Sequence, residues 1–422
     1  MLPGVDRTIE AMPQPHSSAT PSAAPRGPGW KFVAFVGFLA ALGAVTTDMY
    51  LPSLPQVASD LQTSKALAQA TITGVLLGGA VGQLVMGALS DRFGRRRPAM
   101  VGIAIHVAAS VAAAFAPNIA TLLTLRVIQG FGNASATVCA LAVVRDRFTG
   151  ATASAILSRL LLVIGLAPLL APSVGGLIAH WWSWRAVFFV LAAFGALLIL
   201  AVLMLLPETL PPERRSAAGL GAALRGYGTL LRDWRFLALA LLPGLQLAAL
   251  IAYVSGSPFV LQEQFGLSDK QFAAFFAFMG LGLIGGAQVN AALVKRARPS
   301  KLLRVGLLTT LALAVALVVV TTCDVGGVWL LGANLWFLLG ASAFIGPNAT
   351  TMALADHGAR AGRGAAVIGS LQAGIAGLVA PLVGVIGADA QAMAIVMCGA
   401  IGAATIVAYI GARPYKAAAH LP

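Results

Sequence analysis

The sequence predicts an all-α integral membrane protein with about twelve transmembrane helices. Of its 422 residues, 59% are hydrophobic and only 10% are charged, whereas charged residues make up about 25% of soluble domains. Apolar segments of about 18 residues or more recur along the whole chain, and each is long enough to cross the hydrocarbon core. The predicted spans are residues 32–54, 67–89, 98–116, 120–143, 156–180, 186–206, 236–259, 271–294, 302–322, 328–350, 364–387 and 391–411.

Basic residues are distributed unevenly between the segments that connect these spans. The formal net charge is +14, which taken alone is compatible with nucleic-acid binding. With a cytoplasmic amino terminus and twelve spans, however, the outward loops hold only Lys65, Arg185 and Lys270. This is the positive-inside pattern of a membrane protein. We therefore expect a lipid bilayer around the chain, both termini in the cytoplasm and no nucleic-acid partner.

Composition divides the chain into five parts. Residues 1–29 are rich in Pro, Ser and Ala and lack a leader pattern, so we expect a disordered cytoplasmic tail. A polar connection at residues 207–235 separates two groups of six apolar segments, and a partial register between the groups favours an internal repeat. The remaining parts are two predicted six-helix bundles, at residues 30–206 and 236–412, and a cytoplasmic tail at residues 413–422.

The first span carries a carboxylate, Asp48, in the string Thr-Thr-Asp-Met-Tyr-Leu-Pro. An acid at this depth costs roughly 2.5–3.5 kcal/mol on insertion scales, so by default it marks an ion or proton pathway. Asp48 lies about 24 Å along a helix that begins near Phe32, in the outward half of the span. The alternative is that Asp48 caps a helix or lies in the outer headgroup zone.

The loop after the second span combines an acid, arginines and glycines in a fixed spacing. Gly87 admits a neighbouring helix, Gly94 permits a tight turn, and Asp91, expected just past the helix end, is able to pair with an arginine or cap a facing helix. An ordinary basic inside loop would explain the arginines but not this spacing. We expect a gating loop formed by Gly87, Asp91, Arg92, Gly94, Arg95 and Arg96.

The fourth span carries an arginine, Arg126, in the string Leu-Arg-Val-Ile-Gln-Gly. It lies roughly 9 Å from the outer face of its span, a depth comparable with that of Asp48. The two charges could therefore face one cavity as a proton-coupling pair, although the sequence does not establish contact. The alternative is that Arg126 snorkels outward.

The fifth span is unusually rich in glycine and proline. Proline kinks a helix and glycine admits close packing, so a bent, tightly packed helix can act as a hinge or a seal. The alternative is that both residues are simply common in membrane helices. The residues concerned are Gly165, Pro168, Pro172, Gly175 and Gly176.

Polar and aromatic residues within the spans are candidates to line a substrate cavity. Each of them is also a candidate for a hydrogen bond between helices, and Tyr50, two residues after Asp48, points away from the same helix face. His106 and His180 are expected to be packing or interface residues. The cavity candidates are Tyr50, Gln129, Asn133, Gln246, Tyr253, Asn334 and Trp336.

Nothing in the chain indicates catalysis or a bound cofactor. The three cysteines are scattered singly through apolar segments, which indicates neither a disulfide framework nor a metal site. The sequence holds no Walker loop, no catalytic triad and no cluster of metal ligands. We expect no cofactor, no metal and no enzymatic activity.

These strings resemble signatures of the major facilitator superfamily. The loop after the second span resembles the superfamily signature, and the strings around Arg126 and at residues 165–176 resemble motifs of its drug–proton antiporter branch. The string around Asp48 is similar to the first-span signature of the Bcr/CflA multidrug subfamily of bacterial inner-membrane exporters. Ala171 stands where the fifth-span motif most often has glycine, so we expect the helix packing at that point to differ from the family's.

The resemblance implies two six-helix bundles around a central cavity and a role for Asp48 in proton coupling. The predicted protein is a monomeric antiporter that exchanges protons for small amphipathic or apolar toxic compounds across the inner membrane. The alternative within the superfamily is a symporter or uniporter for a sugar or metabolite. A receptor or an enzyme would need a ligand domain or a polar catalytic cluster.

Overall fold

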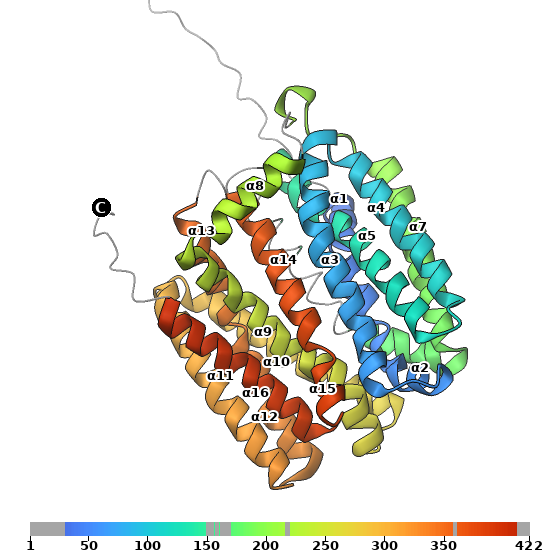
Figure 1. Cartoon of the computed structure of the whole chain (residues 1–422), viewed down its shortest axis with the longest axis vertical. Helices are drawn as coiled ribbons and strands as arrows, with labels where there is room; N and C mark the ends of the chain where they lie inside the picture. Colours follow the sequence, from blue (N-terminus) through green and yellow to red (C-terminus); the bar gives the residue numbers. More distant parts are fainter. Residues whose placement is uncertain are drawn as a thin grey trace, which may run out of the picture.

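The computed structural model describes residues 30–148, 156, 160, 170–215, 220–357 and 361–411. Over these residues all the regular secondary structure is helical and no strand is present (Figure 1). Eleven helical segments in this part are long and apolar enough to cross a membrane. Most of the predicted span 156–180 lies outside the described residues, although 170–181 are helical. The predicted tails at 1–29 and 413–422 also lie outside them.

The first half of the chain forms one group of helices. Side-chain caps fix the starts of two of them: Ser64 accepts a hydrogen bond from the Leu67 N–H at 3.2 Å, and Asn118 accepts one from the Thr121 N–H at 2.9 Å. The helices are α1 (Trp30–Asp48), α2 (Leu54–Asp60), α3 (Lys65–Phe93), α4 (Arg96–Ala114), α5 (Ile119–Arg147) and α7 (Trp184–Leu205).

The second half forms a matching group. Asp233 caps its first helix by accepting from two backbone N–H groups, and Ser268 and Gln271 form a capping box at the next. The helices are α9 (Trp234–Pro258), which continues as the π-helical turn η3 (Phe259–Gln264), α10 (Asp269–Leu293), α11 (Pro299–Thr322), α12 (Gly327–Ser342), α13 (Ile345–Ala355), α14 (Ala361–Val379), α15 (Leu382–Ile386) and α16 (Ala390–Gly411).

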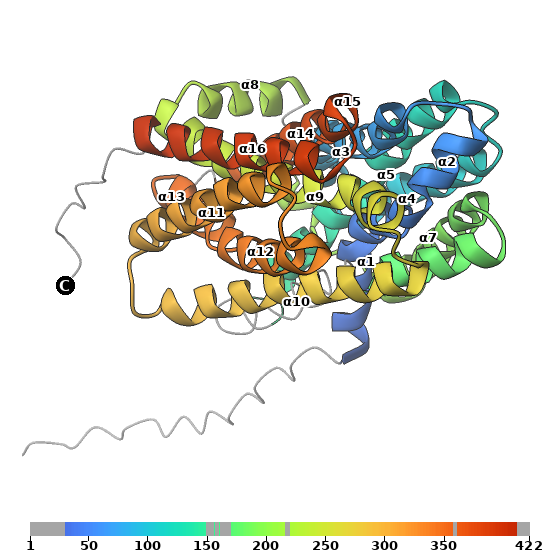
Figure 2. The ribbon, with the colours of Figure 1, turned by 90° about the horizontal axis from the view of Figure 1, so that it is seen from below.

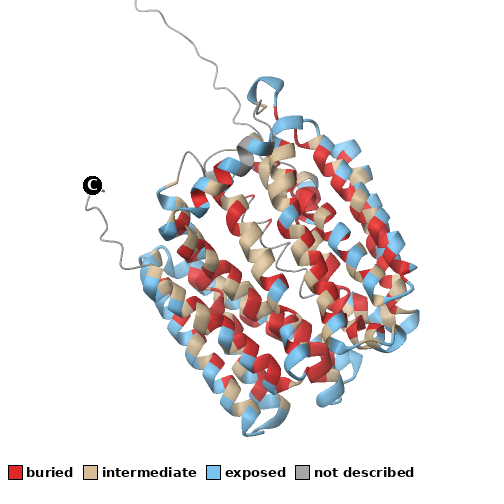
Figure 3. Cartoon of the chain, viewed as in Figure 1, coloured by how far each residue is buried: buried red, intermediate tan, exposed pale blue. Residues whose placement is uncertain are grey.

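The two groups lie side by side, with α3 and α14 in contact between them (Figures 1 and 2). Small residues permit this approach: a Cβ on Gly377 would lie 3.1 Å from Leu76, and one on Gly374 would lie 3.9 Å from Ala80. Buried residues gather on the inward faces, and exposed residues lie mostly on the outside (Figure 3). The exposed residues include large apolar side chains such as Phe38, Leu200 and Phe337. That outer surface is suited to contact lipid.

The connection between the two groups contains a helix that sequence analysis did not predict. Helix α8 (Leu220–Leu231) lies across one end of the molecule (Figure 1). The Tyr227 hydroxyl donates to the Leu84 carbonyl oxygen on α3 at 3.4 Å, while Leu230 packs in a cluster with Phe236 of α9. The connection therefore contacts both groups.

Candidate transport site

The first span is interrupted at Asp48. Helix α1 ends at this residue, and a short 3-10 turn (Leu51–Ser53) follows before α2 begins. Pro52 and Pro55 lack the N–H groups that would continue the α-helix, which accounts for the break. Asp48 is buried, with 7% of its surface exposed. Among the described residues no ion pair involves its carboxylate.

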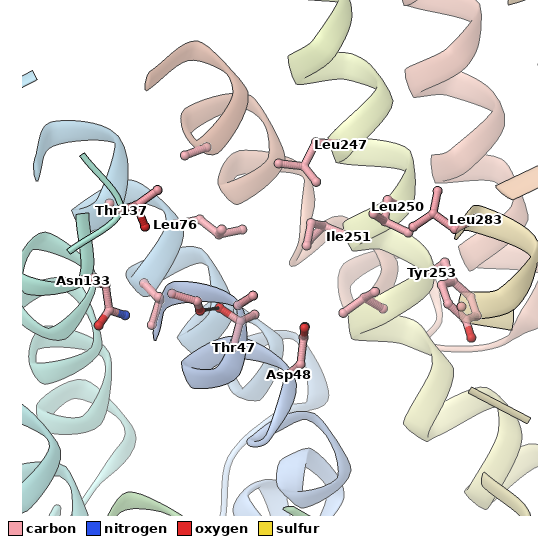
Figure 4. A pocket seen from close by; sticks show the side chains of 18 of the residues that line it. Thr47, Asp48, Leu76, Asn133, Thr137, Leu247, Leu250, Ile251, Tyr253 and Leu283 are labelled. Carbon is pink, nitrogen blue, oxygen red and sulfur yellow. Dashed lines mark hydrogen bonds between the residues drawn. The ribbon is translucent and has the colours of Figure 1, made fainter. Parts of the chain in front are cut away.

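Asp48 lines a cavity between the two groups of helices. The cavity has a volume of about 300 Å³ and a largely apolar wall. Figure 4 shows Asp48 and Thr47 between Asn133 of α5 on one side and Tyr253 of α9 on the other. Neither the Asn133 amide nor the Tyr253 hydroxyl has a hydrogen-bond partner in the described part of the chain. The polar lining residues are Thr47, Asp48, Gln83, Asn133, Thr137 and Tyr253.

Arg126 does not pair with Asp48 but lies behind the cavity wall, with 0% of its surface exposed. Its Nη1 donates to Gln129 Oε1 at 2.6 Å and to the Thr46 carbonyl oxygen at 3.5 Å, and its Nε donates to the Thr71 carbonyl oxygen at 3.4 Å. Thr46 belongs to the last turn of α1, where carbonyl groups present negative charge. The cation is thus stabilised by backbone and amide oxygens.

Aromatic rings complete the surroundings of Arg126. Its guanidinium lies 4.6 Å from the ring centre of Tyr50 and 5.6 Å from that of Phe188, distances at which a ring face attracts a cation. The hydroxyl groups of Tyr50 and Thr71 are hydrogen-bonded at 3.0 Å. Tyr50 therefore faces into the first group of helices, away from the cavity.

The described part of the fifth-span motif packs on the backbone beside Asp48. A Cβ on Gly175 would lie 1.8 Å from the Met49 carbonyl oxygen, so only glycine fits at this position. Gly176 has more room, because its Cβ would lie 3.7 Å from Pro52. Pro172 is buried in the same helical stretch. Gly165 and Pro168 lie outside the described residues.

The loop after α3 is held by a cluster of charges within the first group of helices. Asp91 lies in the last turn of α3, which runs to Phe93, rather than just past the helix end as predicted. Arg95 donates to Asp91 at 2.6 Å and to Asp146 of α5 at 2.8 Å. Asp146 also accepts from the Thr209 hydroxyl at 3.2 Å. The pairs join the ends of α3 and α5 to the segment after α7.

Glu208 closes this cluster from the segment after α7. Its carboxylate accepts from the backbone N–H groups of Arg95 at 2.8 Å and Arg96 at 3.2 Å. Gly94, at φ +91°, leaves the space that the carboxylate occupies, since a Cβ there would lie 2.3 Å from a Glu208 oxygen. Partial burial raises the pKa of Glu208, but four backbone N–H groups outweigh it and hold the pKa below its ordinary value.

The carboxylates around Arg95 likewise favour its charged form. Burial lowers the pKa of Arg95, but its hydrogen bonds to Asp146 and Asp91 outweigh this and raise the pKa above its ordinary value. Arg92 lies at the edge of the cluster with its guanidinium 5.2 Å from the Phe93 ring. Gly87 lies nearest to Tyr227 of α8, whose hydroxyl would be 4.0 Å from a Cβ on that glycine.

Two of the predicted cavity residues, Asn133 and Tyr253, line the cavity, and the others do not. Trp336 instead stacks on Phe278 with ring centres 6.0 Å apart, and Gln246 lies against Gly346. Sequence analysis did not select Thr137, although it lies one helical turn after Asn133 and so shares its face. The predicted residues off the lining are Tyr50, Gln129, Gln246, Asn334 and Trp336.

A model of the Major Facilitator Superfamily matches residues 33–381 of this sequence. The chain belongs to that superfamily. The membership confirms the predicted fold and makes the protein a membrane transporter rather than an enzyme.

The relatives of this major facilitator include a transporter and two proteins that are named for drug resistance. It is 35% identical over 364 residues to the MFS-type transporter YdgK of Bacillus subtilis (strain 168), covering 86% of this chain and 90% of YdgK. It is 28% identical over 378 residues to the bicyclomycin resistance protein homolog of Haemophilus influenzae (strain ATCC 51907 / DSM 11121 / KW20 / Rd), covering 90% and 95%. It is 32% identical over 234 residues to the multidrug resistance protein MdtL of Klebsiella pneumoniae (strain 342), covering 56% and 59%.

Solved structures of other major facilitators share the fold. The xylose transporter XylE from E. coli, in a partially occluded inward-open conformation, has a TM-score of 0.71 at 14% identity, covering 92% of this chain and 99% of XylE. The human organic anion transporter MFSD10 has a TM-score of 0.64 at 20% identity, covering 89% and 98%. Likeness at these identities concerns the fold alone.

Proposed function

We propose that this protein exports small amphipathic or apolar toxic compounds across the bacterial inner membrane in exchange for protons. The observation that carries the proposal is the position of Asp48, a carboxylate without an ion-pair partner among the described residues, on the wall of a largely apolar cavity. Proton coupling needs a carboxyl group that is charged in one state and neutral in another. The resistance proteins among the relatives support the same substrate class.

The cavity suits such compounds better than it suits a sugar. Apart from its six polar residues, its wall consists of apolar side chains and glycines, and a sugar would leave many hydroxyl groups there without partners. Besides Asp48, the Asn133 amide and the Tyr253 hydroxyl lack hydrogen-bond partners in the described part of the chain, and so few polar groups can orient a substrate without excluding apolar ones. A symporter or uniporter for a sugar is therefore the weaker alternative.

The proposed orientation places both termini in the cytoplasm and the α2 end of the molecule outside. We further propose that the protein acts as a monomer. At that end Lys65 and Glu263 form an ion pair between the two groups, and His180 Nδ1 lies 3.3 Å from the Asp269 carboxylate. Gln69 of α3 also donates to the Ser255 carbonyl oxygen of α9 at 3.1 Å. These contacts must separate before the cavity opens outward.

The test uses purified protein in vesicles with an imposed pH gradient. A panel of toxic compounds is first screened on cells with and without the protein, and each compound that it protects against is then added to the vesicles. Exchange for protons predicts accumulation driven by the gradient and a coupled proton flux in the opposite direction. Asp48→Asn should abolish both while the protein still folds. Proton movement in the same direction as the substrate would instead indicate symport.

A further inference from the structure

Four polar side chains form a chain in the interior of the first group of helices. Arg126 donates to Gln129 as described, and Gln129 Nε2 donates to Ser110 Oγ of α4 at 2.7 Å. Ser110 Oγ lies 3.5 Å from His106 Nε2, which also lies 3.2 Å from the Leu191 carbonyl oxygen of α7. All four side chains have 0% of their surface exposed. A buried polar chain of this length is costly unless its members are paired.

The donor and the acceptor of each hydrogen bond in this polar chain of four side chains can be assigned from its geometry. A guanidinium only donates, so the Gln129 oxygen faces Arg126 and its NH₂ group faces Ser110. The Ser110 hydroxyl donates to the His106 carbonyl oxygen at 2.7 Å. His106 Nε2 therefore faces two acceptors, Ser110 Oγ and the Leu191 oxygen, and must carry the ring proton. The lone pair is left on Nδ1.

The other side of the His106 ring faces Asn133. In the described part of the chain neither Nδ1 nor the Asn133 amide has a hydrogen-bond partner within bonding geometry, although the two lie beside each other. Asn133 follows Gln129 by one helical turn and lines the cavity (Figure 4). Small residues make room for the ring, because a Cβ on Gly195 of α7 would lie 2.8 Å from His106 Cδ2. The polar chain thus runs from His106, beside Asn133 of the cavity wall, to Arg126.

At its other end the chain determines where a positive charge lies. Arg126 contacts the carbonyl group two residues before Asp48, and its guanidinium lies over the ring of Tyr50, two residues after Asp48. Its shortest hydrogen bond is to Gln129, so its position depends on the side chains behind it. Moving a cation away from a carboxylate favours the protonated form of the acid.

We propose that His106 is a positioning residue, which holds Arg126 at the end of α1 through Ser110 and Gln129 and thereby sets the pH at which Asp48 takes up a proton. The inference rests on the proposed function, in which Asp48 carries the proton. In the described part of the chain, the titratable side chains that line the cavity or flank the polar chain are Asp48, Tyr50, His106, Arg126 and Tyr253.

The test is an infrared titration of the full-length protein in lipid, which requires no substrate. The protonated-carboxyl band that Asp48→Asn removes reports on Asp48 alone. Ser110→Ala, which removes the acceptor for Gln129, and His106→Leu should each move its midpoint to higher pH by about half a unit or more. His106→Gln keeps a donor near the position of Nε2, so its midpoint should stay within about 0.2 units of the wild type.

Thr137→Val is the matched control. Thr137 also lines the cavity on α5, but its hydroxyl donates to the Ala40 carbonyl oxygen at 3.2 Å and lies outside the polar chain, so the midpoint should not move. Combining Ser110→Ala with His106→Leu should shift the midpoint no further than the larger single shift, because both break one chain.

A purely structural role for His106 would lower the melting temperature and leave the midpoint unchanged. That result overturns the proposal, as do additive shifts in the double variant or the absence of any band that Asp48→Asn removes. The proposed function fails on a different result, namely the absence of proton-driven transport by the wild type in vesicles.

Discussion

At the scale of single residues, the buried Arg126 is stabilised by groups other than carboxylates among the residues that the structure describes. Arg126 has three oxygen acceptors, on Gln129, Thr46 and Thr71, and the ring faces of two aromatic residues. These acceptors lie on α1, α3 and α5, and a planar guanidinium reaches them at once because its donors are fixed in a fork. An ammonium group on a flexible stem does not reproduce that geometry.

Replacing Arg126 should therefore affect transport in two steps. Arg126→Lys keeps the charge but loses the fork, so we expect an initial rate of roughly a tenth of the wild-type rate. Arg126→Ala leaves three buried oxygens without their donor, and its rate should fall to background. Initial rates in vesicles, at matched amounts of folded protein, provide the measurement. Equal rates for the two variants would show that the charge has no role beyond the hydrogen bonds.

Sequence analysis predicted a comparable depth for Asp48 and Arg126, and Arg126 does contact Thr46 and Tyr50 on either side of Asp48, but the arrangement of the two side chains was not predicted. Residue counts along a helix predict how deep Asp48 and Arg126 lie, because the rise per residue is fixed. They do not predict which face each side chain occupies once Pro52 interrupts the first span.

The hydrogen-bond partners of Arg95 and of its neighbouring backbone were not predicted either. Asp146 and Glu208 are distant from Arg95 in sequence, and only the packing of the helices brings them to the loop.

At the scale of helices, close backbone contact fixes the position of the break in the first span. The stretch 170–181 touches the Met49 carbonyl group at Gly175, whereas a Cβ on the next residue, Gly176, would meet Pro52 at an ordinary contact distance of 3.7 Å. The end of α1 therefore lies between Arg126 on one side and a glycine-lined helix on another. Any movement of Asp48 requires one of these two neighbours to move as well.

Gly175→Ala should destabilise the protein, because its Cβ would overlap the Met49 carbonyl oxygen. We expect a loss of about 1–3 kcal/mol, the usual range for overpacking, measured by thermal unfolding in detergent. Gly176→Ala is the matched control, since its Cβ meets Pro52 at an ordinary distance, and its effect should stay within about 0.5 kcal/mol. Equal effects of the two substitutions would argue against the close contact.

The segment after α7 should add a pH-dependent contribution to stability. Because folding lowers the pKa of Glu208, its contribution is complete above the unfolded pKa and is lost as pH falls through the folded value. Glu208→Gln removes this contribution. The difference in melting temperature between wild type and variant should therefore be largest near neutral pH and vanish in acid. A difference that is constant across the titration would contradict the assignment.

At the scale of the whole molecule, the layout of the membrane helices followed from hydropathy alone. The observed helices begin and end within a few residues of most predicted spans, because about twenty apolar residues are what a bilayer requires. Helix α8 was not predicted because the polar residues around it are typical of a loop. Its apolar residues indicate a helix only once the fold places Phe236 and its neighbours against them.

The ion pair between Lys65 and Glu263 at the α2 end should control access to the cavity. Lys65→Gln leaves Glu263 unpaired and should raise the rate at which an impermeant thiol reagent, added from that side, labels Val254→Cys in a cysteine-free background. Exposed pairs contribute up to about 1 kcal/mol, so we expect a two- to fivefold increase, about the factor that such an energy allows. Lys270→Gln is the control, because among the described residues Lys270 forms no ion pair. Unchanged labelling in Lys65→Gln would exclude a gating role for the pair.

Asp48 is the one carboxylate among the described residues of the cavity wall. A single carboxylate carries one proton per cycle, which limits the substrate gradient that the proposed exchange can sustain. With one proton returned per molecule exported, each unit of pH difference supplies about 1.4 kcal/mol and sustains at most a tenfold substrate gradient. Export of a neutral compound also moves one charge, so the membrane potential adds about 2.3 kcal/mol per 100 mV. Export of a monovalent cation is electroneutral and gains nothing from the potential. Cells with a large potential and a small pH difference should therefore be protected better against neutral compounds than against cationic ones.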